Sequence, residues 1–169
     1  MSGIRGFTLI EILLTLTVLS ALLLIGIPQF TDFSSDARRA VTRDRMSVIR
    51  EAIMGDPRLV SGGVYTKPGY IGNCLRAPDT NRLNDLSVDP GSGQCPPGAY
   101  DPVTRLGWNG PYLDTSSADW KKDAWGTDFE YTLSTGADTI WGTNDDVRTL
   151  TSCGSNAICG DSDDITTIF

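Results

Sequence analysis

The sequence predicts an α+β protein in which a long N-terminal helix packs on a small C-terminal antiparallel sheet. Three features indicate this fold class. An apolar run from Phe7 to Ile27 continues as an amphipathic pattern to Met54, residues 59–103 are rich in Gly, Pro, Asn and Asp, and partly alternating apolar residues begin at about residue 128. With 169 residues, the chain provides one modest domain besides the apolar run.

The apolar run, residues 7–27, carries one charge, that of Glu11. At a rise of about 1.5 Å per residue, such a helix is roughly as long as the hydrocarbon core of a bilayer is thick. Burial of a carboxylate in that environment without a partner is costly. Glu11 is therefore a candidate functional residue.

The amphipathic stretch from Gln29 to Met54 predicts that the helix continues, because its apolar residues recur at steps of three and four. These residues are Phe30, Phe33, Ala37, Ala40, Val41, Val48, Ile49, Ala52 and Ile53. We expect one helix from about Thr8 to Met54, bent near Pro28 and ended by Gly55-Asp56-Pro57. Its arginines are either a solvated, ion-paired face or contacts to acidic surfaces of neighbouring subunits.

Charge and composition limit the functions to consider. The net charge is −7, and from Asp101 onward the sequence has twelve acidic residues and four basic ones. An acidic half argues against nucleic acid and suits cations. The chain has no histidine, which excludes Ser/His and Cys/His catalysis, and no paired acid and base is recognisable. We therefore expect a protein that is not an enzyme.

The four cysteines are Cys74, Cys95, Cys153 and Cys159. None forms a CxxC pair, so they indicate two disulfides in an oxidising compartment rather than a zinc site. Of the three pairings that four cysteines allow, we favour Cys74–Cys95 with Cys153–Cys159. The first bond would tie an irregular region over residues 56–127, and a sheet would follow over 128–169, with its first strand at about 128–133.

An acidic pattern occurs twice, in residues 134–147 and, eighteen positions later, in residues 152–165. Ser, Gly, Ile, Gly and an Asp-Asp pair coincide between the two copies. A loop that closes with paired carboxylates supplies the oxygen ligands that calcium prefers, although the spacing is not that of an EF-hand. The alternative is that one or both copies are only polar turns between strands.

A six-residue polar leader, residues 1–6, ends at Gly6 and precedes the long apolar run, which begins Phe7-Thr8-Leu9-Ile10-Glu11. This N-terminus resembles the class III signal of type IV pilins and type II secretion pseudopilins. The resemblance implies cleavage after Gly6, methylation of Phe7, and pairing of the Glu11 carboxylate with the amine of Phe7 on a neighbouring subunit. An ordinary single-pass anchor would explain the length of the run, but neither the Gly-Phe junction nor the positions of Glu11 and Pro28.

Residues 107–113 and 122–131 are similar to two tryptophan blocks of major pseudopilins, with Ala124 where the family pattern has proline. The acidic copies resemble the calcium-binding loop of the same family. Carried over position by position, the resemblance implies two ligand sets. They are Asp138, Asp145 and Asp146 with the carbonyls of Thr135 and Ile140, and Asn156, Asp163 and Asp164 with the carbonyls of Cys153 and Ile158.

The resemblance implies a pilin fold and a structural role. The expected parts are a leader (1–6), a membrane and filament-core helix (7–28), its amphipathic continuation (29–55), an irregular region (56–127) and the sheet (128–169). The subunit would polymerise through its N-terminal helices, from the inner membrane into the periplasm. Its partners would be minor pseudopilins, the inner-membrane assembly platform and the prepilin peptidase.

Two other readings stay open: a type IV pilin of a surface fibre and a membrane-anchored periplasmic enzyme. Two lines of evidence disagree on which side of the membrane the C-terminal domain lies. The arginines that follow the apolar run favour a cytoplasmic C-terminal domain by the positive-inside rule. The cysteines and the resemblance favour the periplasm, which is the orientation we expect.

Overall fold

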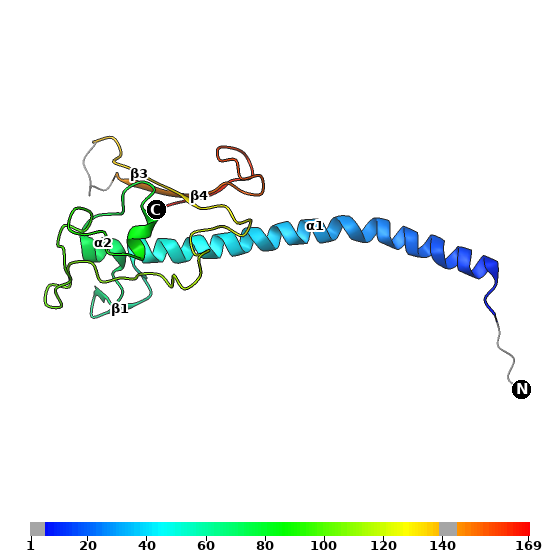
Figure 1. Cartoon of the computed structure of the whole chain (residues 1–169), viewed down its shortest axis with the longest axis horizontal. Helices are drawn as coiled ribbons and strands as arrows, with labels where there is room; N and C mark the ends of the chain where they lie inside the picture. The colour runs from blue at the N-terminus through cyan, green and yellow to red at the C-terminus, as the bar shows by residue number, and fades with distance from the viewer. Residues whose placement is uncertain (1–5, 139–144) are drawn as a thin grey trace, which may run out of the picture. The chain divides into compact units, whose positions relative to one another are not determined.

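The protein has an α+β fold, in which N-terminal helical structure precedes a three-stranded antiparallel sheet with long loops (Figure 1). The structure, a computed structural model, describes residues 6–138 and 145–169, and the side chains of residues 24–32, 60, 64 and 65 lie outside this description. The chain forms two compact units, residues 1–38 and 39–169.

Helix α1 (Leu9–Met54) confirms the single long helix expected from the sequence. Thr8 caps its start, since the Thr8 carbonyl and hydroxyl oxygens both accept the main-chain N–H of Glu11. Gly55 ends the helix with a φ of 88°, at a place where a Cβ would overlap the main chain of Lys67 and Pro68. The predicted bend at Pro28 falls among the side chains that lie outside the description.

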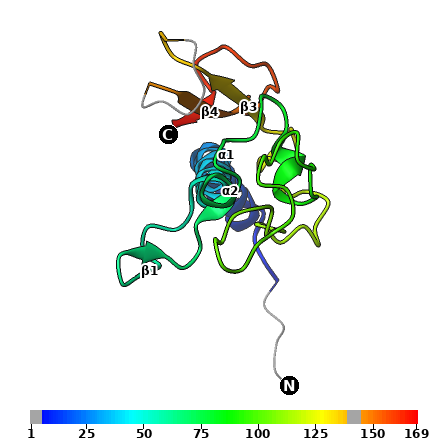
Figure 2. The same ribbon diagram turned by 90° about the vertical axis from the view of Figure 1, so that its left-hand side faces the viewer.

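In the second unit, α1 contributes its buried face to the core through Met46, Ile49 and Ile53. Figure 2 looks along this helix, with the sheet on one side of it and the loop region on another. The buried face is rotated from the one we predicted. Thr42 is fully buried, whereas Val41 and Val48 are 45% and 48% exposed, because periodicity fixes the width of an apolar stripe but only tertiary contacts fix its direction.

The loop region holds short elements that we did not predict. They are a hairpin of β1 (Val60–Ser61) and β2 (Val64–Tyr65), helix α2 (Gly69–Cys74) and the 3-10 helix η1 (Leu83–Leu86). The Cys74–Cys95 disulfide, which we predicted, ties the end of α2 to the loop after η1. Side chains also pair with the main chain, as where Trp108 donates its indole N–H to the Asp85 carbonyl at 2.9 Å.

The sheet has the order β3–β4–β5, formed by β3 (Glu130–Ser134), β4 (Val147–Ser152) and β5 (Ile165–Ile168). Tyr131 of β3 pairs with Leu150 of β4, and both side chains are fully buried. The first strand starts two residues later than predicted, because the main chain of Phe129 still bonds to Lys121 in the preceding loop.

A turn over residues 122–127 joins α1 to the sheet. Buried Asp123 accepts the Ser152 hydroxyl at 2.6 Å and the main-chain N–H groups of Trp125 and Thr127 at 2.9 Å each. From α1, Arg45 donates to the carbonyls of residues 122 and 123 at 2.8 and 3.0 Å. Because Ser152 ends β4, this network fixes the base of the loop that follows.

The alanine at position 124 has a structural consequence. Its main-chain N–H donates to the hydroxyl of Thr42, a fully buried residue of α1, at 3.2 Å. A proline at this position would have no N–H and could not make this bond. The alanine therefore allows a contact between the turn and the helix.

Candidate functional site

The two acidic copies found in the sequence share a local structure. In the first copy, the Asp145 carboxylate accepts the main-chain N–H of Ala137 at 2.8 Å. In the second, the Asp163 carboxylate accepts the main-chain N–H of Ser155, also at 2.8 Å. Each partner lies eighteen residues after its counterpart, so the repeated sequence folds into a repeated turn.

A glycine with positive φ makes each turn possible. Gly136 and Gly154 have φ values of 65° and 64°. A Cβ at either position would overlap the carboxylate of Asp145 or Asp163 respectively. The glycines thus permit both the backbone conformation and the close approach of the carboxylate.

The second copy connects β4 to β5 and is closed by the predicted disulfide Cys153–Cys159. Three hydrogen bonds order the loop further. The Asn156 amide donates to Asp161 at 2.6 Å, the main-chain N–H of Ile158 donates to the Asn156 oxygen at 2.8 Å, and that of Gly160 donates to Asp164 at 2.7 Å. These contacts turn the acidic side chains toward one another.

Asp161, Asp163 and Asp164 form an acidic cluster that could hold a metal ion. One oxygen from each carboxylate lies within 4.8 Å of the others. Oδ1 of Asp164 is buried and has no hydrogen-bond partner among the described residues. Three converging carboxylates fit a hard cation such as calcium, whereas this cluster offers no sulfur or imidazole for softer metals.

The cluster favours the charged form of Asp163. A hydrogen bond with the Asp161 side chain lowers the pKa of Asp163 to about 2, and the N–H and hydroxyl donors of Ser155 act in the same direction. Asp163 is therefore ionised at neutral pH without any bound cation. A cation at this place would meet a negative charge that is already formed.

The predicted ligands of the second copy are only partly brought together. Asp163 and Asp164 belong to the cluster, and Asn156 borders it through its hydrogen bond to Asp161. The amide oxygen of Asn156 is engaged by the N–H of Ile158. Asp161 is the member that the sequence comparison missed, since the first copy has a threonine at the matching position.

The first copy lies partly outside the described residues, because residues 139–144, Ile140 among them, are not described. Asp145 is bonded to the main chain of Ala137 and Asp138. The Asp146 side chain is 3% exposed and lies 3.6 Å from the Arg148 guanidinium. Thr135, the remaining predicted ligand, directly follows β3.

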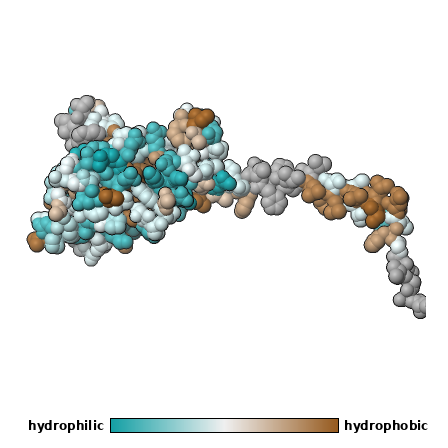
Figure 3. All heavy atoms as spheres, in the orientation of Figure 1, coloured by the Kyte–Doolittle hydropathy of each residue, from teal (hydrophilic) through white to brown (hydrophobic). Residues whose placement is uncertain are grey.

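The N-terminal candidates lie at the start of α1. Gly6 precedes the helix, Phe7 is 80% exposed and Glu11 is in the first helical turn. From Phe7 to Leu23, large apolar side chains are exposed by between 48% (Ile12) and 80% (Leu9), and they are brown in Figure 3. Across the described part of the chain, no helix combines the length and apolarity that crossing a membrane requires.

No family model, curated protein or solved structure matches this chain.

Proposed function

We propose that this chain is a pilin-like structural subunit, closest in role to the major pseudopilin of a type II secretion system. In this proposal a peptidase removes residues 1–6, and the subunit waits in the inner membrane with residues 39–169 in the periplasm. It then polymerises into a filament that drives protein export. The two disulfides support an oxidising compartment for the second unit.

The observation that carries the proposal is the exposed apolar surface of residues 7–23. Consecutive residues such as Ile12, Leu13 and Leu14 point in directions about 100° apart, so the apolar surface surrounds the helix. Such a surface requires a cover of lipid or of other apolar helices. A filament built from N-terminal helices supplies the second kind of cover, and the membrane supplies the first before assembly.

Glu11 fits this proposal as the residue that sets the register between subunits. Among the described residues no basic group lies within salt-bridge distance of its carboxylate. Cleavage after Gly6 would create an amine at Phe7, and pairing of that amine with Glu11 of a neighbour would neutralise two charges in an apolar setting. A subunit without Glu11 would leave the amine unpaired.

Calcium is the cation proposed for the Asp161, Asp163 and Asp164 cluster, with the first copy as a second site. The cation would offset the repulsion among three carboxylates and stabilise the loop between β4 and β5. The loop begins at Ser152, whose hydroxyl donates to Asp123 in the turn over residues 122–127. A cation that orders the loop would therefore also stabilise this turn.

A deletion strain tests the proposed role. Loss of secretion with intact surface pili supports a pseudopilin, and complementation with the full chain should restore secretion. Complementation with Glu11→Ala should fail, whereas Thr15→Ala, a change of an exposed helix residue, serves as the matched control. Normal secretion with lost surface pili would favour the surface-fibre reading. Normal assembly of the Glu11→Ala variant would contradict the role assigned to Glu11.

A further inference from the structure

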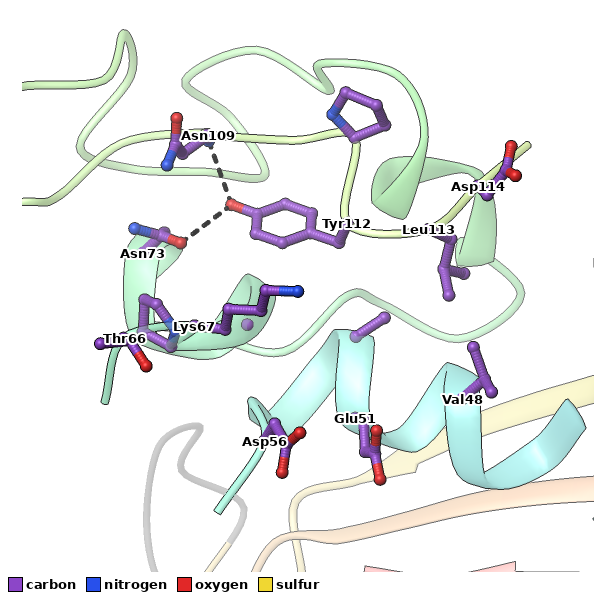
Figure 4. A pocket seen from close by; sticks show the side chains of 14 residues that line it. Val48, Glu51, Asp56, Thr66, Lys67, Asn73, Asn109, Tyr112, Leu113 and Asp114 are labelled. Atoms are coloured by element: carbon purple, nitrogen blue, oxygen red, sulfur yellow. Dashed lines mark hydrogen bonds between the residues drawn. The ribbon is translucent and has the colours of Figure 1, made fainter. Parts of the chain in front are cut away.

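Arginine side chains pair with several of the carboxylates in the second unit. Glu51 and Asp56 line one groove beside α1, shown in Figure 4, and Arg58 lies 2.9 Å from each of these carboxylates. Arg82 pairs with buried Asp85, also at 2.9 Å. These carboxylates therefore have a cation within the chain itself, which favours their charged form.

The first acidic copy has such a cation in Arg148. Nη2 of Arg148 lies 3.6 Å from the carboxylate of Asp146, and the two side chains are 15% and 3% exposed. Asp146 directly precedes β4 and Arg148 is the second residue of that strand, so both side chains leave the chain on the same side. Because the pair is largely shielded from water, its attraction is stronger than that of an exposed pair.

The second copy differs from the first at two matching positions. Eighteen residues after Arg148 the sequence has Thr166, which carries no charge and is exposed. Asp161 stands where the first copy has Thr143. The second copy thus has an additional carboxylate and lacks the arginine.

The acidic cluster of the second copy has no cation of its own. In the part of the chain that the structure describes, Asp161, Asp163 and Asp164 have no salt-bridge partner. Oδ2 of Asp164 accepts the N–H of Gly160 at 2.7 Å, whereas its buried Oδ1 has no hydrogen-bond partner there. A buried carboxylate oxygen without a partner is costly. A cation that binds at this oxygen would remove that cost.

We propose that Arg148 makes the first copy a weaker calcium site than the second. In the first copy, a calcium ion competes with the Arg148 guanidinium for the carboxylate of Asp146. In the second copy, with Thr166 at the matching position, the ion meets no competing side chain. The inference rests on the proposed calcium sites and adds the residue that determines the order in which they fill.

Calorimetric titration of calcium into the metal-free full chain in detergent tests the role of Arg148. In wild type we expect a tight binding step and a weaker one. Arg148→Thr gives the first copy the residue of the second, so it should strengthen the weaker step by about tenfold, or make it visible, and leave the tight step unchanged. Arg148→Lys keeps the positive charge and is the matched control, in which the weaker step should stay weak.

The reverse exchange, Thr166→Arg, tests the same idea at the second copy. Thr166 is exposed, so this change decides the question even if Arg148→Thr fails to fold. It adds a positive charge two residues after Asp164 and should weaken the tight step by about tenfold. Thr166→Gln adds a long side chain without charge, and its tight step should match that of wild type.

Three results would count against the inference. No gain in the weaker step of a folded Arg148→Thr variant would overturn it, as would equal affinities of the tight step in Thr166→Arg and Thr166→Gln. Either result, obtained with calcium bound, leaves the proposed calcium sites standing. The absence of calcium binding in wild type and in all variants would contradict the proposed sites and this inference together.

Discussion

Replacement of Asp123 by alanine removes the buried acceptor that joins the 122–127 turn to the sheet. The side chain is 2% exposed and accepts three hydrogen bonds, from Ser152, Trp125 and Thr127. Hydrogen bonds to charged groups contribute about 1.5–3 kcal/mol each. Trp125 and Thr127 are half-buried, whereas Ser152 is fully buried, so the loss of the bond from Ser152 should cost the most. We therefore expect a loss of about 3–5 kcal/mol in the free energy of unfolding.

Such a loss is a large share of the roughly 5–15 kcal/mol that stabilises a typical domain. Asp123→Asn keeps one acceptor oxygen for the two main-chain donors, so we expect it to lose less than the alanine variant. Urea unfolding of the full chain in detergent measures both, followed by tryptophan fluorescence, since Trp125 lies in the same turn. The control is Asp119→Ala, whose carboxylate is 64% exposed and 3.6 Å from Lys122, with an expected loss under about 1 kcal/mol.

A loss in Asp123→Ala no larger than in Asp119→Ala would refute this reasoning. It would mean that water replaces all three bonds, and that Thr42 and Arg45 alone hold the turn against α1. An alanine variant less stable than the asparagine variant, with both below wild type, is the ordering that the geometry requires.

Three further changes test other parts of the structure. Ala124→Pro should lower the free energy of unfolding by about 1–2 kcal/mol in the same urea assay, because it deletes the donor to Thr42. Gly154→Ala should lower the midpoint of thermal unfolding more than Gly62→Ala does; both glycines have positive φ, but only at Gly154 would the new Cβ meet a side chain, that of Asp163. Equal losses at the two positions would contradict the close approach. Asp163 has a pKa of about 2 in the folded protein, below the unfolded value of about 4. Its stabilising contribution is therefore present above about pH 4 and is lost as the pH falls through about 2. Between these pH values, the midpoint of thermal unfolding should depend less on pH in Asp163→Asn than in wild type. An equal pH dependence in the two proteins would contradict the lowered pKa of Asp163.

Most of the features that the sequence predicted correctly depend on patterns of residues that lie close together in the chain. Helix α1 followed from apolar spacing and from the Gly55 stop. The number of cysteines predicted two disulfides, and the pairing that we favoured among the three possible ones is the pairing in the structure. The repeated turn followed from matching residues eighteen positions apart. For the helix and the repeated turn, residues close in the sequence determine the structure, so the pattern is visible without knowledge of the fold.

Features that depend on distant segments were not predictable in this way. In the sequence, Asp123 cannot be distinguished from the other loop carboxylates. Its role becomes visible only from its hydrogen bonds with Ser152 and Trp125. Asp161 was missed because comparison of the two copies draws attention to shared residues, whereas Asp161 enters the cluster through the path of its own loop. We predicted that Val48 belongs to the apolar face of the helix, but its side chain is 48% exposed, and the cause is again contact between distant segments.

The intact mass of the mature protein tests the central claim most directly. Under the proposal, protein extracted from the membrane of the source cells has lost residues 1–6 and carries one added methyl group on Phe7. It retains both disulfides, so reduction adds the mass of four hydrogens. A mass equal to that of the full 169-residue chain, or cleavage at another position within the apolar run, would contradict the proposal that this chain is a processed pilin-like subunit.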